Sequence, residues 1–137
     1  MRNTGHRLGA SGTNLENTIQ GLKNKINNLD DKNFKYWEFD IRESSDGVIF
    51  VFHDDVIKLE NELVEISKMS FLEIKEAGRK LDISIPTFEE VVTELEKRKE
   101  KVMIEIKEIF SDEAKYELIN RTSGHENWKI MATPERF

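Results

Sequence analysis

The chain has 137 residues, of which 35% are charged, and its formal net charge is −6 at pH 7. This length suits one domain, residues 1–137, with a real hydrophobic core, and the acidic balance excludes a general nucleic-acid binder, which would need a basic face. The absence of cysteine excludes disulfides and thiolate metal sites.

The N-terminal residues lack the apolar stretch of a signal peptide, and no segment is apolar over the length of a membrane span. We therefore expect a cytoplasmic protein without stable membrane insertion.

The first third of the chain predicts a short strand, a helix and a longer strand. The first strand is expected over residues 3–7, although its composition is polar. Thr13 and Glu16 have the spacing of a capping box, which predicts a helix that continues to about Leu29. The second strand is expected over residues 35–42, where apolar and acidic side chains alternate.

A hairpin is expected after the second strand, because Asp46-Gly47 is typical of a tight turn and residues 48–53 read as a returning strand. Residues 54–69 are charged and show no clear periodicity, so no helix or strand is predicted for them. The remaining elements follow in order: a helix from Ser70 to about Gly78, a helix opening at Pro86, a strand over 102–107, a helix from Ser111 to about Gly124 and a strand over 128–132.

Strands that alternate with helices imply parallel β/α units. The predicted fold class is therefore α/β. It is part of a (β/α) TIM-type barrel, with about four β/α units and a β-hairpin after the second strand.

Two of the predicted strands carry charged residues on a face that should be inward. Glu38 and Asp40 share one face of their strand, and Glu105 shares a face with Lys107. Taken alone, either pair is more often a solvated face with salt bridges. Charges inside a sheet are costly unless they are paired or bind a metal, so two such strands together indicate a hard, oxygen-liganded divalent cation.

Six short motifs occur in a fixed order along the chain. They are GHR (5–7), ENT (16–18), WEFDIRESSDG (37–47), VFHDD (51–55), IPTFEEV (85–91) and MIEIK (103–107). This set resembles the glycerophosphodiester phosphodiesterase family, firmly from Gly5 to about Lys107 and more weakly through Thr133. The family fold is a (β/α)₈ barrel of about 250 residues, so the chain resembles a short, truncated member.

The resemblance implies a metal site. Glu38, Asp40 and Glu105 match the family's metal ligands, and three carboxylates suit Ca²⁺ or Mg²⁺. We expect the three side chains to converge on one ion.

The resemblance also implies catalytic and phosphate-binding residues. His6 and His53 match the family's acid/base pair, and Arg7 and Lys107 match positive groups beside the substrate phosphate. Leu8 departs from the family pattern, which has glycine after the arginine.

Two neighbouring polar residues have open interpretations. Asp54 either ends the hairpin or orients His53. Asn17 lies where helix capping is a sufficient explanation, with a minor polar role at the site as the alternative.

The expected activity is that of an enzyme, a metal-dependent phosphodiesterase that hydrolyses glycerophosphodiesters to glycerol 3-phosphate and an alcohol. The alternatives are a catalytically silent remnant, a half-barrel that needs a partner chain, and a related barrel phospholipase. The expected partner is the small-molecule substrate. A homodimer that pairs the first strand of each copy with the last strand of the other would close an eight-stranded barrel.

Overall fold

A computed structural model describes residues 2–132 of the chain. Thr133, where the weaker part of the motif resemblance ends, lies outside these residues. Along the chain the elements are η1 (His6–Gly9), α1 (Ile19–Ile26), β1 (Trp37–Glu43), β2 (Ile49–Val51), β3 (Val56–Leu59), β4 (Glu62–Glu65), η2 (Ile66–Lys68), α2 (Phe71–Lys80), α3 (Phe88–Leu95), β5 (Val102–Glu108), α4 (Asp112–Thr122) and β6 (Trp128–Met131).

The main sheet has the strand order β2-β1-β5-β6. β1, β5 and β6 run parallel, whereas β2 folds back antiparallel onto β1, as the Asp46-Gly47 turn predicts. Among the described strands β6 pairs only with β5, so the sheet is open at this edge. The α/β class, the hairpin and the partial barrel are thus confirmed.

The first predicted strand is wrong, because η1 occupies part of the segment and the rest is irregular. Arg7 and Leu8 have left-handed backbone angles, with φ of 49° and 60°, which no strand can contain. The segment still lies beside β1, where the Glu38 N–H donates to the Gly5 carbonyl at 3.0 Å. The Asn3 side chain donates to a neighbouring backbone carbonyl and accepts from three backbone N–H groups, which replaces part of a strand ladder.

The helix predicted from Thr13 begins later, after Thr18, whose hydroxyl caps α1. The expected capping box does not form, because the Glu16 carboxylate instead accepts hydrogen bonds from Arg7. Asn17 has a left-handed φ of 57°, which interrupts any helix at this point.

The other predicted helix starts are confirmed. Ser70 and Thr87 each open a helix with a full capping box, and Ser111 caps α4. α2 continues past Gly78 to Lys80, so this glycine does not end the helix. A Cβ at position 78 would lie 2.7 Å from Ile85 Cδ1 and 3.0 Å from the backbone oxygen of Ile83, so a larger residue there needs its neighbours to shift.

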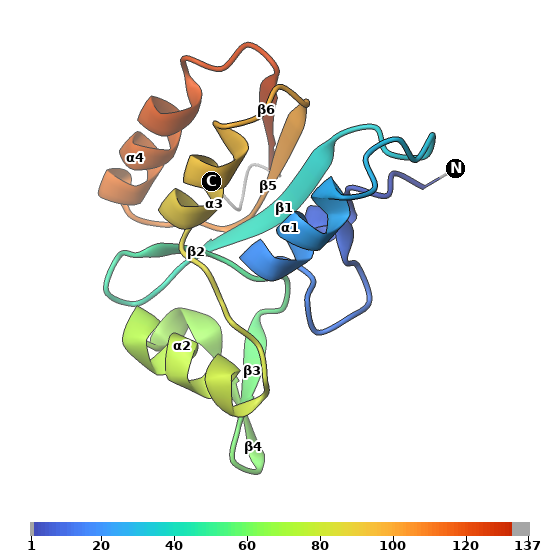
Figure 1. Ribbon diagram of the computed structural model, residues 1–137. Helices are drawn as coiled ribbons and strands as arrows, with labels where there is room; N and C mark the ends of the chain where they lie inside the picture. The colour runs from blue at the N-terminus through green and yellow to red at the C-terminus, as the bar shows by residue number, and fades with distance from the viewer. Residues whose placement is uncertain (1, 133–137) are drawn as a thin grey trace.

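Two hydrophobic clusters hold the fold together. Trp37 and Phe39 of β1 are fully buried in the larger cluster, with side chains of β5, α1, α3 and α4. Figure 1 shows α3 and α4 side by side along the sheet. The smaller cluster joins Phe50 of β2 to α2, η2 and the β3–β4 hairpin, which form a lobe beyond β2 (Figure 1).

The alternation of β1 sends its acidic side chains to the face opposite Trp37 and Phe39. η1 packs on β1 and helps to bury that face. Within residues 2–132, no helix has both the length and the apolar character that crossing a bilayer requires.

Candidate active site

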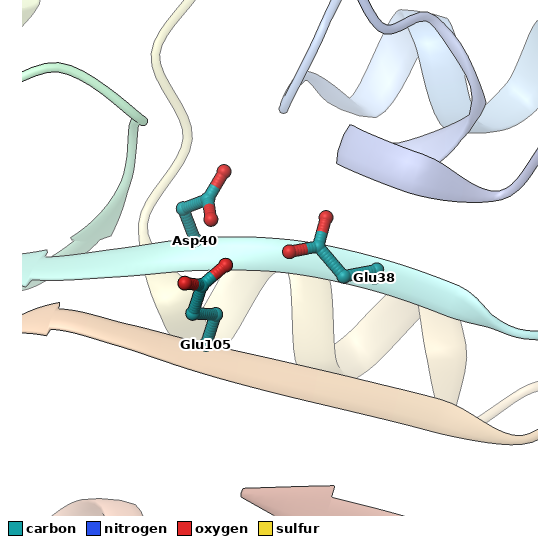
Figure 2. A group of neighbouring side chains, drawn as sticks. All are labelled: Glu38, Asp40 and Glu105. Atoms are coloured by element: carbon teal, nitrogen blue, oxygen red, sulfur yellow. The ribbon is translucent and has the colours of Figure 1, made fainter. Parts of the chain in front are cut away.

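Three carboxylates from two adjacent strands meet above the sheet. Glu38 and Asp40 come from β1, and Glu105 comes from β5, where it is the parallel-register neighbour of Asp40. One oxygen of each group lies within 4.8 Å of the others. Figure 2 shows the three side chains on the same side of the two strands. The inward alternation expected on both strands therefore brings the three residues together.

Burial distinguishes this cluster from a solvated acidic face. Glu38 is 6% exposed and Asp40 is 1% exposed, so neither is a surface carboxylate with free access to water. Two such charges, with Glu105 beside them, repel one another in a medium of low polarity. A solvated salt-bridge face is therefore a poor description of Glu38 and Asp40.

Burial and the repulsion between the carboxylates shift their pKa values. Burial, together with the charges of Asp40 and Glu105, raises the pKa of Glu38 from 4.5 to about 8. Burial also raises the pKa of Asp40, against the opposing effect of a hydrogen bond from Asn17. Burial acts to raise the pKa of Glu105 as well, but the ammonium of Lys107 outweighs it and the pKa is lowered. With no cation present, Glu38 therefore holds a proton at neutral pH.

The donor set fits a hard divalent cation. Asp40 Oδ1 is buried and makes no hydrogen bond within residues 2–132, so one oxygen of the most buried carboxylate is available as a ligand. Three carboxylate groups are the ligands that Ca²⁺ prefers, and Mg²⁺ also accepts them. A divalent charge at this point would remove the repulsion that raises the pKa of Glu38.

His6 lies at the start of η1, beside the carboxylates. Its Nε2 is 3.6 Å from Glu38 Oε1, and its Nδ1 is 3.1 Å from the hydroxyl of Ser11. Burial and the adjacent charge of Arg7 lower the pKa of His6, which favours the neutral imidazole. The ring forms part of an open recess of about 470 Å³ that also includes Glu38 and Tyr36.

Arg7 links the loop before α1 to the carboxylates. Its backbone N–H donates to Glu38 Oε1 at 2.9 Å, and its Nη1 donates to both oxygens of Glu16, at 2.9 and 3.0 Å. Its Nε is buried, makes no hydrogen bond in the described part of the chain and lies 3.9 Å from Asp40 Oδ2. The guanidinium is thus held between Glu16 and the carboxylate cluster.

Leu8 occupies the position where the family pattern has glycine. It adopts a φ of 60° and is fully buried in the larger core. A left-handed conformation is unfavourable for a branched residue, and burial of the side chain offsets that cost. The turn that glycine would make freely is thus still formed.

His53 and Lys107 come from two other segments, the loop after β2 and the strand β5. His53 follows β2, and its Nδ1 is 2.7 Å from Asp54 Oδ1, so Asp54 orients the ring rather than only ending the hairpin. Lys107 Nζ donates to Glu105 Oε1 at 3.0 Å. The charge of His53 acts to lower the pKa of Asp40, although burial outweighs it. The expectation that His6 and His53 face each other across a phosphate stays a prediction.

Three further polar residues hold the site together; sequence reasoning missed Glu16 and Arg42 and gave a site role for Asn17 only as an alternative. Glu16 binds Arg7, Asn17 binds Asp40, and Arg42 donates from Nη2 to the backbone carbonyl of His53 at 2.7 Å. The ENT motif contained the first two, but its spacing also fits a capping box. Arg42 shares the face of Glu38 and Asp40, so strand alternation alone could have placed it inward.

Several solved structures have the same fold. A glycerophosphodiester phosphodiesterase from Agrobacterium tumefaciens is 26% identical, with a TM-score of 0.65 over 88% of this chain and 54% of that chain. One from Thermotoga maritima is 27% identical, with a TM-score of 0.62 over 88% of this chain and 49% of that one. A phosphodiesterase from Oleispira antarctica, in complex with the product sn-glycerol-3-phosphate, is 22% identical, with a TM-score of 0.63 over 89% and 53%.

This chain therefore spans about half the length of these relatives. No curated protein matches it by sequence. The model of the glycerophosphoryl diester phosphodiesterase family, however, matches residues 6–137, which is nearly the whole chain. Together with the ordered motifs and the three converging carboxylates, this match shows that the chain belongs to the glycerophosphoryl diester phosphodiesterase family.

Proposed function

We propose that this domain is a metal-dependent phosphodiesterase that hydrolyses glycerophosphodiesters to glycerol 3-phosphate and an alcohol. The observation that carries the proposal is the buried trio of Glu38, Asp40 and Glu105, whose oxygens lie within 4.8 Å of one another. Family membership supports the proposal, as does the likeness to the Oleispira antarctica phosphodiesterase with its bound product.

Glu38, Asp40 and Glu105 would hold the cation, Ca²⁺ or Mg²⁺. When bound, the cation supplies positive charge that stabilises the developing charge on phosphate and orients the attacking group. The carboxylates would determine where that charge lies, because Glu38 and Asp40 share one face of β1 and Asp40 is the register neighbour of Glu105 on β5.

Two imidazoles would move the protons. One takes a proton from the attacking water as the new P–O bond forms, and the other gives a proton to the leaving alkoxide as the old P–O bond breaks. The lowered pKa of His6 keeps its ring neutral and suits it to accept the proton. The carboxylate of Asp54 lies 2.7 Å from His53 Nδ1 and orients the ring, which leaves His53 for the second proton transfer.

Arg7 and Lys107 would bind the phosphate oxygens. The two Glu16 contacts fix the Arg7 guanidinium, so little side-chain freedom is lost when it meets an anion. Lys107 is only 15% exposed and lies 3.0 Å from Glu105, the β5 member of the carboxylate cluster. Both cations would neutralise phosphate charge in an otherwise acidic cluster.

The open edge of the sheet favours a second candidate, a half-barrel that becomes active only with a partner chain. Ile130 and Met131 of β6 are 39% and 50% exposed, and β6 has no strand on its far side among the described residues. The homodimer expected from the sequence pairs the first strand of one copy with the last strand of the other. This pairing cannot form as expected, because residues 3–7 are not a strand. A homodimer joined in another way remains part of the proposal.

Hydrolysis of glycerophosphocholine and glycerophosphoethanolamine tests the proposal directly. Glycerol 3-phosphate released by the purified protein should depend on added Ca²⁺ or Mg²⁺ and disappear with chelator. Glu105→Gln should abolish the activity, whereas Glu62→Gln, at an exposed site on β4, should leave it unchanged. Activity that appears only above a threshold protein concentration would favour the half-barrel with a partner, and inactivity at every concentration would contradict the enzyme proposal.

A further inference from the structure

Asn17 is a buried polar residue in an unusual conformation next to the carboxylates. It is 2% exposed, and its φ of 57° lies in the left-handed region that few residues other than glycine adopt. Asparagine is among the residues that tolerate this region best, and such conformations persist where the surrounding structure determines them. Its role in the site is not explained by helix capping, because Thr18 caps α1.

The contacts of Asn17 connect two parts of the site. Its backbone N–H donates to the Arg7 carbonyl at 2.8 Å, which fixes the residue against η1. Its side-chain Nδ2 donates to Asp40 Oδ2 at 3.0 Å, and its Oδ1 accepts from the Asp40 backbone N–H at 3.4 Å. One side chain therefore holds both the carboxylate and the backbone of Asp40.

The two oxygens of Asp40 have different surroundings as a result. Oδ2 is occupied by Asn17 and lies 3.9 Å from Arg7 Nε, whereas Oδ1 is buried and makes no hydrogen bond within residues 2–132. A carboxylate fixed through one oxygen presents the other in a single direction. Groups that orient a metal ligand in this way change metal affinity even though they do not touch the metal.

We propose that Asn17 is a positioning residue that fixes Asp40 as a single-oxygen ligand for the divalent cation. This inference rests on the proposed metal site. Its physical basis is preorganisation: in the absence of the amide, the carboxylate could rotate and would lose that fixed direction, so cation binding would have to order it.

The test substitutes glycine, which accepts a positive φ without strain and removes only the side chain. Asn17→Gly should bind Ca²⁺ roughly 10- to 100-fold more weakly in calorimetry, the range typical of lost partners of metal ligands. Asn17→Ser provides a second variant. Its hydroxyl is polar but too short to reach Asp40, so it should weaken binding by a similar factor even if the glycine variant folds poorly.

Thr18→Ala is the matched control. Thr18 is the next residue in the chain, is equally buried and caps α1, but none of its hydrogen bonds goes to the carboxylate cluster. The control should lower the melting temperature and change Ca²⁺ affinity by less than about twofold, since a surviving fold keeps its metal ligands.

The outcomes separate this inference from the proposed function. Wild-type protein that binds Ca²⁺, with weaker binding only in the two Asn17 variants, supports the positioning role. Unchanged affinity in both Asn17 variants, or an equal loss in Thr18→Ala, overturns that role and leaves the metal site intact. Wild-type protein that binds neither Ca²⁺ nor Mg²⁺ overturns both.

Discussion

Replacing Glu38 by glutamine should make the metal-free protein more stable at alkaline pH. Glutamine has the same shape and can still accept the hydrogen bond from the Arg7 backbone N–H, but it carries no charge. The carboxyl that it replaces is costly to ionise, because burial and Asp40 raise its pKa from 4.5 to about 8. The substitution therefore removes an unfavourable charge and keeps the packing.

The expected size follows from that pKa. One pKa unit corresponds to about 1.4 kcal/mol, so the rise from 4.5 to about 8 corresponds to about 5 kcal/mol. A raised carboxyl pKa means that the folded state binds the proton more tightly than the unfolded chain. Its contribution to stability is fully present below pH 4.5 and is lost as pH rises through about 8.

Urea denaturation in the presence of chelator measures this effect. At pH 5 the carboxyl of the unfolded chain is already mostly ionised, so between pH 5 and pH 9 the wild-type protein should lose about 4 kcal/mol more of its free energy of unfolding than Glu38→Gln loses. Adding Ca²⁺ should reverse the order, because only the wild-type protein keeps all three ligands. Parallel pH profiles for the two proteins without metal would refute the claim that Glu38 is buried against like charges.

Three further predictions follow from the same structure. Glu38 holds a proton below its raised pKa of about 8, so Ca²⁺ binding at pH 7 should release a proton and should tighten as the pH rises toward 8. Calorimetry in buffers of different ionisation enthalpy measures the proton release, and binding without it would contradict this prediction. His6→Ala and His53→Ala should each lower turnover at least about 10²-fold, and near-normal hydrolysis by either variant would remove that residue from the mechanism. Gly78→Ala should destabilise the fold by about 1–3 kcal/mol, because its Cβ would lie 2.7 Å from Ile85 Cδ1, and an unchanged urea midpoint would contradict this packing.

The parts of the site that lie on strands were predictable from sequence. Alternation in β1 and β5 placed Glu38, Asp40 and Glu105 on inward faces, and parallel register then made Asp40 and Glu105 neighbours. Both strands are long and buried, and in such strands the alternation of apolar and charged residues is a strong predictor of which side chains share a face. The helix starts at Ser70 and Ser111 were predictable for a similar reason, since capping is a local property.

The parts that depend on long-range contacts were not predictable in this way. Glu16 has the spacing of a capping residue, and only the folded chain shows that it binds Arg7 instead. The polar segment over residues 3–7 lies beside β1. Its contacts with the neighbouring chain are made largely by the Asn3 side chain, which replaces the backbone ladder that a strand would need. The β3–β4 hairpin was missed because β4 is mostly exposed and has no apolar face to alternate.

The central claim is that Glu38, Asp40 and Glu105 bind one divalent cation. A crystal structure of the protein with Ca²⁺, or with Mn²⁺ located by its anomalous scattering, tests it most directly. The account predicts one ion with an oxygen of each carboxylate as ligand, at about 2.3–2.6 Å for Ca²⁺. An ion bound elsewhere with the trio vacant, or no bound ion at millimolar concentration, would contradict it.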